Sequence, residues 1–104
     1  QYHRFCFCAA ADATTVDTEG AELDDLGFLI RTSANTKATV LTDIVNAKEG
    51  VVYRIECGDL TNATKIEKSG KFSEVEAWTP AAVGDYIYVY YDAAKGKFFE
   101  ASRG

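Results

Sequence analysis

The residues of this chain best suited to bind a metal are its histidine and its three cysteines. Cys6 and Cys8 are separated by one residue, His3 stands just before them, and Cys57 lies far along the chain. Imidazole and thiolate groups are ligands that zinc prefers, so the four side chains could in principle form a zinc site. Structural zinc motifs, however, usually place roughly two to four residues between paired cysteines. A Cys-x-Cys pair in a strand separates its thiols along the chain, so we expect no metal and no other cofactor.

The cysteines have two further interpretations. They can be small buried hydrophobic residues, or, because an odd number cannot pair completely within one chain, they can form an interchain disulfide or a redox-sensitive contact. Phe5 and Phe7 alternate with Cys6 and Cys8, a pattern typical of an edge strand. Exposed strand edges readily add to a neighbour's sheet. We therefore predict that these four residues lie on or near a contact between subunits.

The sequence shows no apparatus for catalysis. Its single histidine excludes most Ser/His/Asp and Cys/His nucleophilic schemes, and the chain has neither a glycine-rich phosphate loop nor a Gly-x-Ser-x-Gly turn. Carboxylates cluster between Asp17 and Asp25, but without the ligand pattern of an EF-hand loop, which predicts a solvated acidic loop. Spacing alone leaves a glycosidase-like pair of acids open, yet it singles none out. We expect a protein that is not an enzyme.

The most distinctive side chains are aromatic. Tyr86, Tyr88 and Tyr90 recur with period two and therefore share one face of a strand, and Trp78 precedes them. A tyrosine combines a large apolar ring with a polar tip, which suits a surface that is dry in one state and wet in another. The face could be covered by another sheet of the same chain, by another subunit, or by sugar rings that stack on it. We predict that all four residues contribute to assembly contacts.

Charge and length limit the classes of partner. The 104 residues carry a net charge of −5, so the chain repels the phosphate backbone of nucleic acids. No apolar run approaches the roughly 20 residues that a membrane-spanning helix needs. The length fits one globular domain over residues 1–104, with an N-terminal strand and acidic loop over 1–27 followed by a β-module over 28–104. We therefore expect neither nucleic acid nor membrane as a partner.

Apolar residues recur mainly with period two, which predicts an all-β fold. Val51 to Cys57 places apolar residues on one face and Arg54 and Glu56 on the other, as a half-buried antiparallel strand requires. Further strands are predicted between turn-forming residues, at 2–8, 28–31, 38–42, 63–67, 72–77, 85–91 and 98–101. The prediction is a small antiparallel sandwich or barrel-like domain of about eight short strands.

The sequence also predicts the conformation of two connecting segments. Residues 94–97 join two strand patterns, so 85–92 and 97–102 should form a hairpin in which Gly96 has a positive φ. The acidic stretch from Thr18 to Leu26 is the one candidate helix, and we favour a polar loop there.

From Thr39 onward, turn and strand residues follow one another in a recognisable order. In chain order these motifs are Thr42-Asp43-Ile44, Asn46-Ala47-Lys48-Glu49-Gly50, Gly58-Asp59, Thr61-Asn62-Ala63-Thr64-Lys65-Ile66, Ser69-Gly70, Gly84-Asp85, Tyr91-Asp92 and Gly96-Lys97-Phe98-Phe99-Glu100-Ala101-Ser102-Arg103. This order resembles a β-module of bacteriophage structural proteins, found in head and tail fibres and in capsid-associated proteins. The resemblance covers roughly the last two thirds of the chain, and Phe99 stands where the module commonly has Trp.

The resemblance implies a role in the virion. It suggests a capsid decoration protein or a fibre module, assembled in the host cytoplasm, that contacts other virion subunits of the capsid, neck or tail. Such modules often form homo-oligomers, including trimers. An alternative within the same setting is a carbohydrate-binding module of a receptor-binding fibre, in which the aromatic residues would stack on sugar.

Overall fold

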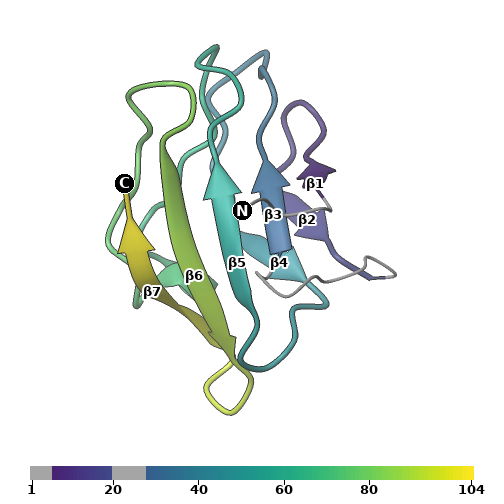
Figure 1. Cartoon of the computed structure of the whole chain (residues 1–104), viewed down its shortest axis with the longest axis vertical. Helices are drawn as coiled ribbons and strands as arrows, with labels where there is room; N and C mark the ends of the chain where they lie inside the picture. The colour runs from purple at the N-terminus through teal and green to yellow at the C-terminus, as the bar shows by residue number, and fades with distance from the viewer. Residues whose placement is uncertain (1–5, 20–27) are drawn as a thin grey trace.

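The computed structural model describes residues 6–19 and 28–104, and within them the chain is almost entirely strands and loops. Five strands form one mixed sheet in the order β1-β3-β5-β6-β7 (Figure 1). They are β1 (Cys6–Cys8), β3 (Phe28–Arg31), β5 (Val52–Glu56), β6 (Tyr86–Asp92) and β7 (Lys97–Arg103). The pairs β1–β3 and β3–β5 are parallel, whereas β5–β6 and β6–β7 are antiparallel.

A second, smaller layer covers one face of this sheet. It contains β2 (Thr15–Asp17) and β4 (Asp43–Val45), which pair in parallel and lie behind β3 and β5 in Figure 1. A short 3₁₀ helix, Gly70–Phe72, packs against β7 on the same side through Phe72. In the described part of the chain, no helix is long and apolar enough to cross a membrane.

The core lies between the two layers. Alternate residues of the large sheet point into it, among them Ile30, Ile55 and Ile87, and each of these is fully buried. Aromatic rings also pack in this core: those of Phe72 and Phe98 stack with their centroids 4.9 Å apart. Because strand side chains alternate between faces, burial of this set leaves the intervening residues on the opposite, outer face of the sheet.

The all-β prediction is confirmed, but the antiparallel sandwich of about eight strands is wrong. Parallel pairs require long crossovers, and the chain provides them, because the connection from β1 to β3 passes through β2 and the one from β3 to β5 passes through β4. Period two alone does not distinguish a parallel from an antiparallel neighbour. The sequence therefore revealed strands without revealing how they pair.

Individual strands were predicted with mixed success. The strands at 28–31 and 98–101 are confirmed throughout, that at 85–91 from residue 86 onward, and that at 51–57 over residues 52–56; the hairpin has Gly96 at φ 66°. Predicted strands at 38–42, 63–67 and 72–77 are wrong: those segments contain isolated bridges but no strand, and Phe72 ends the 3₁₀ helix. Strands β2 and β4 were missed, since each has three residues and only one buried apolar side chain. Of the N-terminal strand predicted at 2–8, residues 6–8 form β1. The rest of that strand, and most of the acidic stretch 18–26, lie outside the described residues.

Three loops at one end of the large sheet are joined by a buried asparagine. Asn35 is 3% exposed, and its Nδ2 donates to the carbonyl of Asn62 at 2.7 Å and to Oγ1 of Thr64 at 2.9 Å. Its Oδ1 accepts a hydrogen bond from the backbone N–H of Asp12 at 2.6 Å. The buried amide thus has all its hydrogen bonds satisfied and ties together two other loops, one of which contributes the buried hydroxyl of Thr64.

Replacing Asn35 with alanine should destabilise the fold. The substitution leaves the N–H of Asp12 and the carbonyl of Asn62 without their partner, so we expect the free energy of unfolding to fall by about 2–3 kcal/mol. Urea denaturation followed by circular dichroism measures the change. The exposed neighbour Lys37→Ala serves as the control and should be nearly neutral. A loss for Asn35→Ala no larger than that of the control would contradict the role assigned to this network.

Candidate functional site

The outer face of the large sheet is the most distinctive surface of the described chain. It presents arginine and glutamate side chains from β3 and β5 beside aromatic rings from β6 and β7. We use the name outer face for this set: Arg31, Arg54, Glu56, Tyr86, Tyr88, Tyr90 and Phe99. The smaller β2–β4 layer lies on the opposite side, and among the described residues no second layer of strands covers the outer face (Figure 1).

Strand register brings these side chains into rows across the sheet. Arg54 of β5 stands opposite Tyr88 of β6, and Glu56 stands between Arg31 of β3 and Tyr86 of β6. Directly opposed residues on one face have Cβ atoms only about 5 Å apart, so their side chains meet. The pairing of three strands therefore assembles a charged and aromatic cluster from residues that are remote in the sequence.

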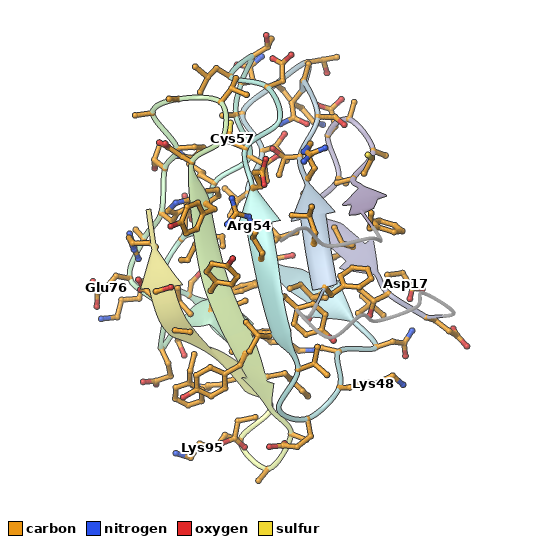
Figure 2. The ribbon with its side chains drawn as sticks, in the orientation of Figure 1. Asp17, Lys48, Arg54, Cys57, Glu76 and Lys95 are labelled. Carbon is orange, nitrogen blue, oxygen red and sulfur yellow. The ribbon has the colours of Figure 1, made fainter. Side chains whose placement is uncertain are left out.

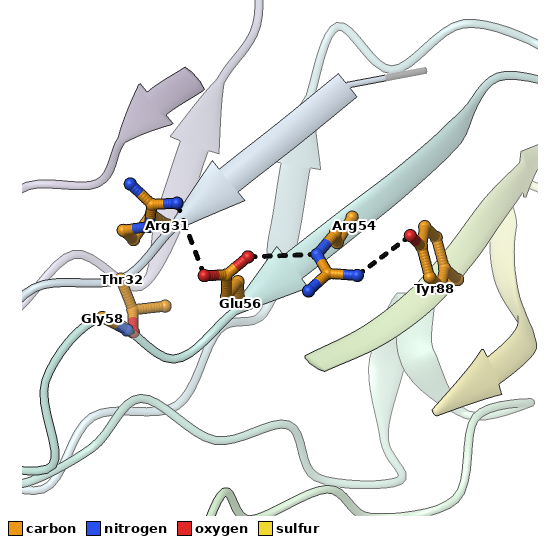
Figure 3. Close-up of polar contacts among 6 residues, drawn as sticks. All are labelled: Arg31, Thr32, Arg54, Glu56, Gly58 and Tyr88. Carbon is orange, nitrogen blue, oxygen red and sulfur yellow. Dashed lines mark hydrogen bonds and ion pairs between the residues drawn. The ribbon is translucent and has the colours of Figure 1, made fainter. Parts of the chain in front are cut away.

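Arg54 is the centre of this cluster. Its Nη1 donates to the hydroxyl oxygen of Tyr88 at 3.0 Å, and its Nε donates to Oε1 of Glu56 at 3.0 Å (Figure 3). The guanidinium carbon lies 3.9 Å from the ring centroid of Tyr86, a cation–π contact. Glu56 in turn pairs with Nη2 of Arg31 at 3.4 Å. Figure 2 shows Arg54 on β5. From there its guanidinium group links the tyrosines of β6 to Glu56 of its own strand.

The electrostatics of Arg54 follow from these contacts. Partial burial of the guanidinium opposes its charge, but the hydrogen bonds to Tyr88 and Glu56 outweigh that effect and raise the pKa of Arg54 above its usual value. Arg54 and Glu56 are each mostly buried, with 21% and 17% of their side chains exposed. The arginine is therefore a permanently charged group held in one orientation.

A second aromatic pair extends the outer face toward the β6–β7 hairpin. Tyr90 stands opposite Phe99, and their rings stack with centroids 5.7 Å apart and planes 20° apart. Tyr90 is 38% exposed, one of the few large hydrophobic residues with a substantial open surface. A continuous aromatic strip therefore runs along β6, from a half-buried end beside Arg54 to an open end beside Phe99.

The residues predicted to make assembly contacts occupy different places. Tyr86, Tyr88 and Tyr90 share the outer face, as their spacing predicted. Trp78 does not join them: it is 4% exposed, belongs to the core and pairs through its backbone with Ile66. A side chain buried in this way offers no surface to a partner of the folded chain.

The N-terminal candidates lie at the opposite edge of the sheet. Cys6 and Cys8 belong to β1, which pairs with β3 at one edge of the sheet formed by the described strands, and Cys8 is exposed with a free thiol. Phe7 is half-buried and packs on the core, with its ring 6.2 Å from that of Phe28. Phe5 lies outside the described residues. Placement at an edge agrees with the predicted edge strand, whereas the inward direction of Phe7 removes most of its ring from any contact surface.

The geometry of the cysteines gives no support to the zinc interpretation. Cys57 is fully buried, and its Sγ lies 3.4 Å from the carbonyl oxygen of Asp59. Cys8 is exposed on β1, which is separated from β5 by β3. Within the described ranges, no three His, Cys, Asp or Glu side chains are grouped so that they could hold a metal ion. His3 lies outside those ranges.

Sequence reasoning missed the charged half of the outer face. The alternation in β5 placed Arg54 and Glu56 on a solvent side, but nothing local indicated that they would meet the tyrosines. That contact depends on the register between β5 and β6, which pairs residues 34 positions apart in the case of Arg54 and Tyr88. The signal available in the sequence was the contrast between two strands: one face of β5 carries Arg54 and Glu56, and one face of β6 carries three tyrosines.

Comparison with known proteins identifies no relative: no protein-family model, no curated protein and no solved structure matches the chain.

The coupling between Arg54 and Tyr88 can be measured with a double-mutant cycle. Arg54→Met keeps the aliphatic packing and removes the charge, and Tyr88→Phe keeps the ring and removes the hydroxyl. Because the two groups are hydrogen-bonded in a partly buried setting, we expect a coupling energy of about 0.5–2 kcal/mol from chemical denaturation. The same cycle with Tyr90→Phe, whose ring stacks on Phe99 instead, is the control and should give almost none. Equal coupling in the two cycles would contradict the network.

The cysteines should differ sharply in reactivity. Burial raises the pKa of the Cys57 thiol, which suppresses the reactive thiolate, whereas Cys8 is exposed. A Cys6→Ser/Cys8→Ser variant, with Cys57 as its sole thiol, should resist an aromatic disulfide reagent near neutral pH until urea unfolds the chain. A Cys6→Ser/Cys57→Ser variant should react at once through Cys8. Rapid labelling of Cys57 in the folded chain would disprove its burial.

Proposed function

We propose that this chain is a non-enzymatic structural module of a bacteriophage particle and that it assembles through its outer face. The observation that carries the proposal is the aromatic strip of β6, whose three tyrosines lie on the side of the sheet opposite the β2–β4 layer. The order of turns and strands that resembles phage structural modules supplies the setting. Large aromatic residues and arginine are the side chains most enriched where protein interfaces gain their binding energy.

Charge favours a second copy of the chain as the occupant of this face. The outer face carries two guanidinium groups and one carboxylate, while the whole chain has a net charge of −5. The outer face thus has a net charge of +1 and the remaining residues together one of −6, so the two are complementary in sign. Contact between two different surfaces of identical subunits is heterologous, and such contacts close into rings, including trimers, when the rotation between subunits allows it.

Preorganisation also supports docking. The rings of Tyr86 and Tyr88 are already fixed by Arg54, and that of Tyr90 is fixed by Phe99. Side chains that are ordered before binding lose less conformational entropy when a partner covers them. Docking on the outer face therefore costs less conformational entropy than docking on freely rotating surface side chains would.

Replacement of Tyr90, the exposed residue of the aromatic strip, tests the proposal. We expect sedimentation velocity to show a closed oligomer for the wild-type chain and a shift to monomer, by at least about tenfold in dissociation constant, for Tyr90→Ser. Val83→Ser is a matched control, because Val83 is 63% exposed in the loop that precedes β6, outside the outer-face set, and also loses an apolar side chain. A wild-type chain that stays monomeric at high concentration, or an oligomer lost only with Val83→Ser, would overturn the assigned interface.

The setting in a virion has its own test. Quantitative mass spectrometry of gradient-purified phage particles should recover the chain in a fixed ratio to the major capsid or tail protein. Its absence from purified particles, with abundance in the soluble lysate, would contradict a structural role in the particle while leaving the outer-face oligomer to be judged separately.

A further inference from the structure

The hairpin end of β7 carries a hollow lined by charged and aromatic side chains. It has a volume of about 400 Å³, within the usual range for small-ligand sites, and is lined by Glu74, Lys95, Lys97 and Phe99. Figure 2 shows Lys95 at the β6–β7 hairpin, at the opposite end of the molecule from Cys57. The proposed assembly function requires neither lysine, so the hollow calls for its own explanation.

Both lysines are available to an anion. In residues 6–19 and 28–104, no carboxylate oxygen lies within 4.0 Å of either ammonium nitrogen. Nζ of Lys97 contacts Oγ of Ser73 at 2.8 Å, and Nζ of Lys95 lies 5.3 Å from the ring centroid of Phe99. Two cations that form no ion pair in the described residues therefore line the hollow, although the carboxylates of Glu74, which also lines it, and of Asp92, which stands opposite Lys97 in the hairpin, reduce the local positive charge.

The backbone that carries the lysines is held firmly. Asp92 accepts hydrogen bonds from the N–H groups of Lys95, at 3.1 Å to its side chain, and Gly96, at 2.8 Å to its carbonyl. The N–H of Ala93 donates to Oε1 of Glu49 at 2.6 Å, which ties the hairpin to the β4–β5 connection. A binding site built on a fixed turn between two paired strands keeps its geometry when empty.

The other two lining groups narrow the ligand class. Phe99, stacked on Tyr90, supplies an apolar aromatic surface, and the exposed carboxylate of Glu74 supplies hydrogen-bond acceptors beside it. A simple anion such as phosphate would gain from the lysines but has no apolar face for Phe99 and no set of hydroxyl donors for Glu74. A ligand that carries a carboxylate, an apolar ring face and several hydroxyl donors satisfies all four residues at once. From this combination we infer that the hollow is a binding site for a carboxylated sugar.

In this site each residue has one role. The ammonium groups of Lys95 and Lys97 pair with the sugar carboxylate, the carboxylate of Glu74 accepts from ring hydroxyls, and the ring of Phe99 packs against the C–H face of the sugar. The shared chemistry fits either a uronic acid or a sialic acid, and these two sources differ in where the carboxylate is attached to the ring. Binding adds a ligand at the end of the sheet and does not depend on oligomerisation through the outer face.

Titration followed by amide NMR tests the inference on the full chain. We expect trigalacturonate or 3′-sialyllactose to shift the amide signals of residues 93–99, and the one that binds identifies the source. The fully methyl-esterified trigalacturonate and neutral lactose are the matched ligands, and each should bind at least about tenfold more weakly because the charged hydrogen bonds are lost. Added salt should weaken binding as well.

Variants complete the test. Lys95→Met/Lys97→Met should raise the dissociation constant at least about tenfold, whereas Lys48→Met, at an exposed lysine of the β4–β5 connection, should leave it unchanged. Phe99→Leu should weaken binding while preserving the fold, which denaturation measures. The inference is overturned if neither acidic sugar shifts the hairpin signals, if the neutral ligands bind equally well, if inorganic phosphate binds as tightly as the sugar, or if the double lysine variant retains full affinity.

Discussion

Strand β6 places its side chains alternately on the two faces of the large sheet, and the rest of the structure depends on this division. Ile87 and Val89 are fully buried against the smaller layer, so Tyr86, Tyr88 and Tyr90 must point the other way. A register shift of one residue would exchange the two sets and place tyrosine hydroxyls in the apolar core. The burial of two aliphatic side chains therefore determines that the opposite surface is aromatic.

The arginine–aromatic network makes the outer face more than a row of exposed rings. Arg54 of β5 is hydrogen-bonded to Glu56 of the same strand and makes cation–π contacts with two tyrosine rings of β6. These contacts stabilise its charge and also order the two rings. Charge and aromatic surface are thereby combined in one rigid unit. The two proposals meet at Phe99: the oligomer contact is centred on β6, and the sugar site lies at the hairpin, where Phe99 stacks on Tyr90 and also lines the hollow.

The sequence predicted the features that depend on local alternation and failed on those that depend on pairing. Alternation located β3, β5 and β6 and the shared face of the tyrosines, and turn residues located the hairpin at Gly96. Parallel order could not be predicted, because it arises from crossovers through β2 and β4, strands of three residues with little apolar pattern of their own. Trp78 is close to the tyrosines in the sequence, which suggested a shared contact surface. Its backbone pairs with Ile66 instead, and its ring is buried in the core.

The central claim is that one face of the large sheet is buried by the chain itself, whereas among the described residues no second layer of strands covers Tyr90 on the other face. Hydroxyl-radical footprinting of the monomeric chain, at high dilution, measures this directly when each residue's rate is normalised to that of the urea-unfolded protein. The structure predicts rapid modification of Tyr90 and Phe99 and strong protection of Trp78 and Phe72. Protection of Tyr90 together with rapid modification of Trp78 would show that the two faces had been assigned the wrong way round.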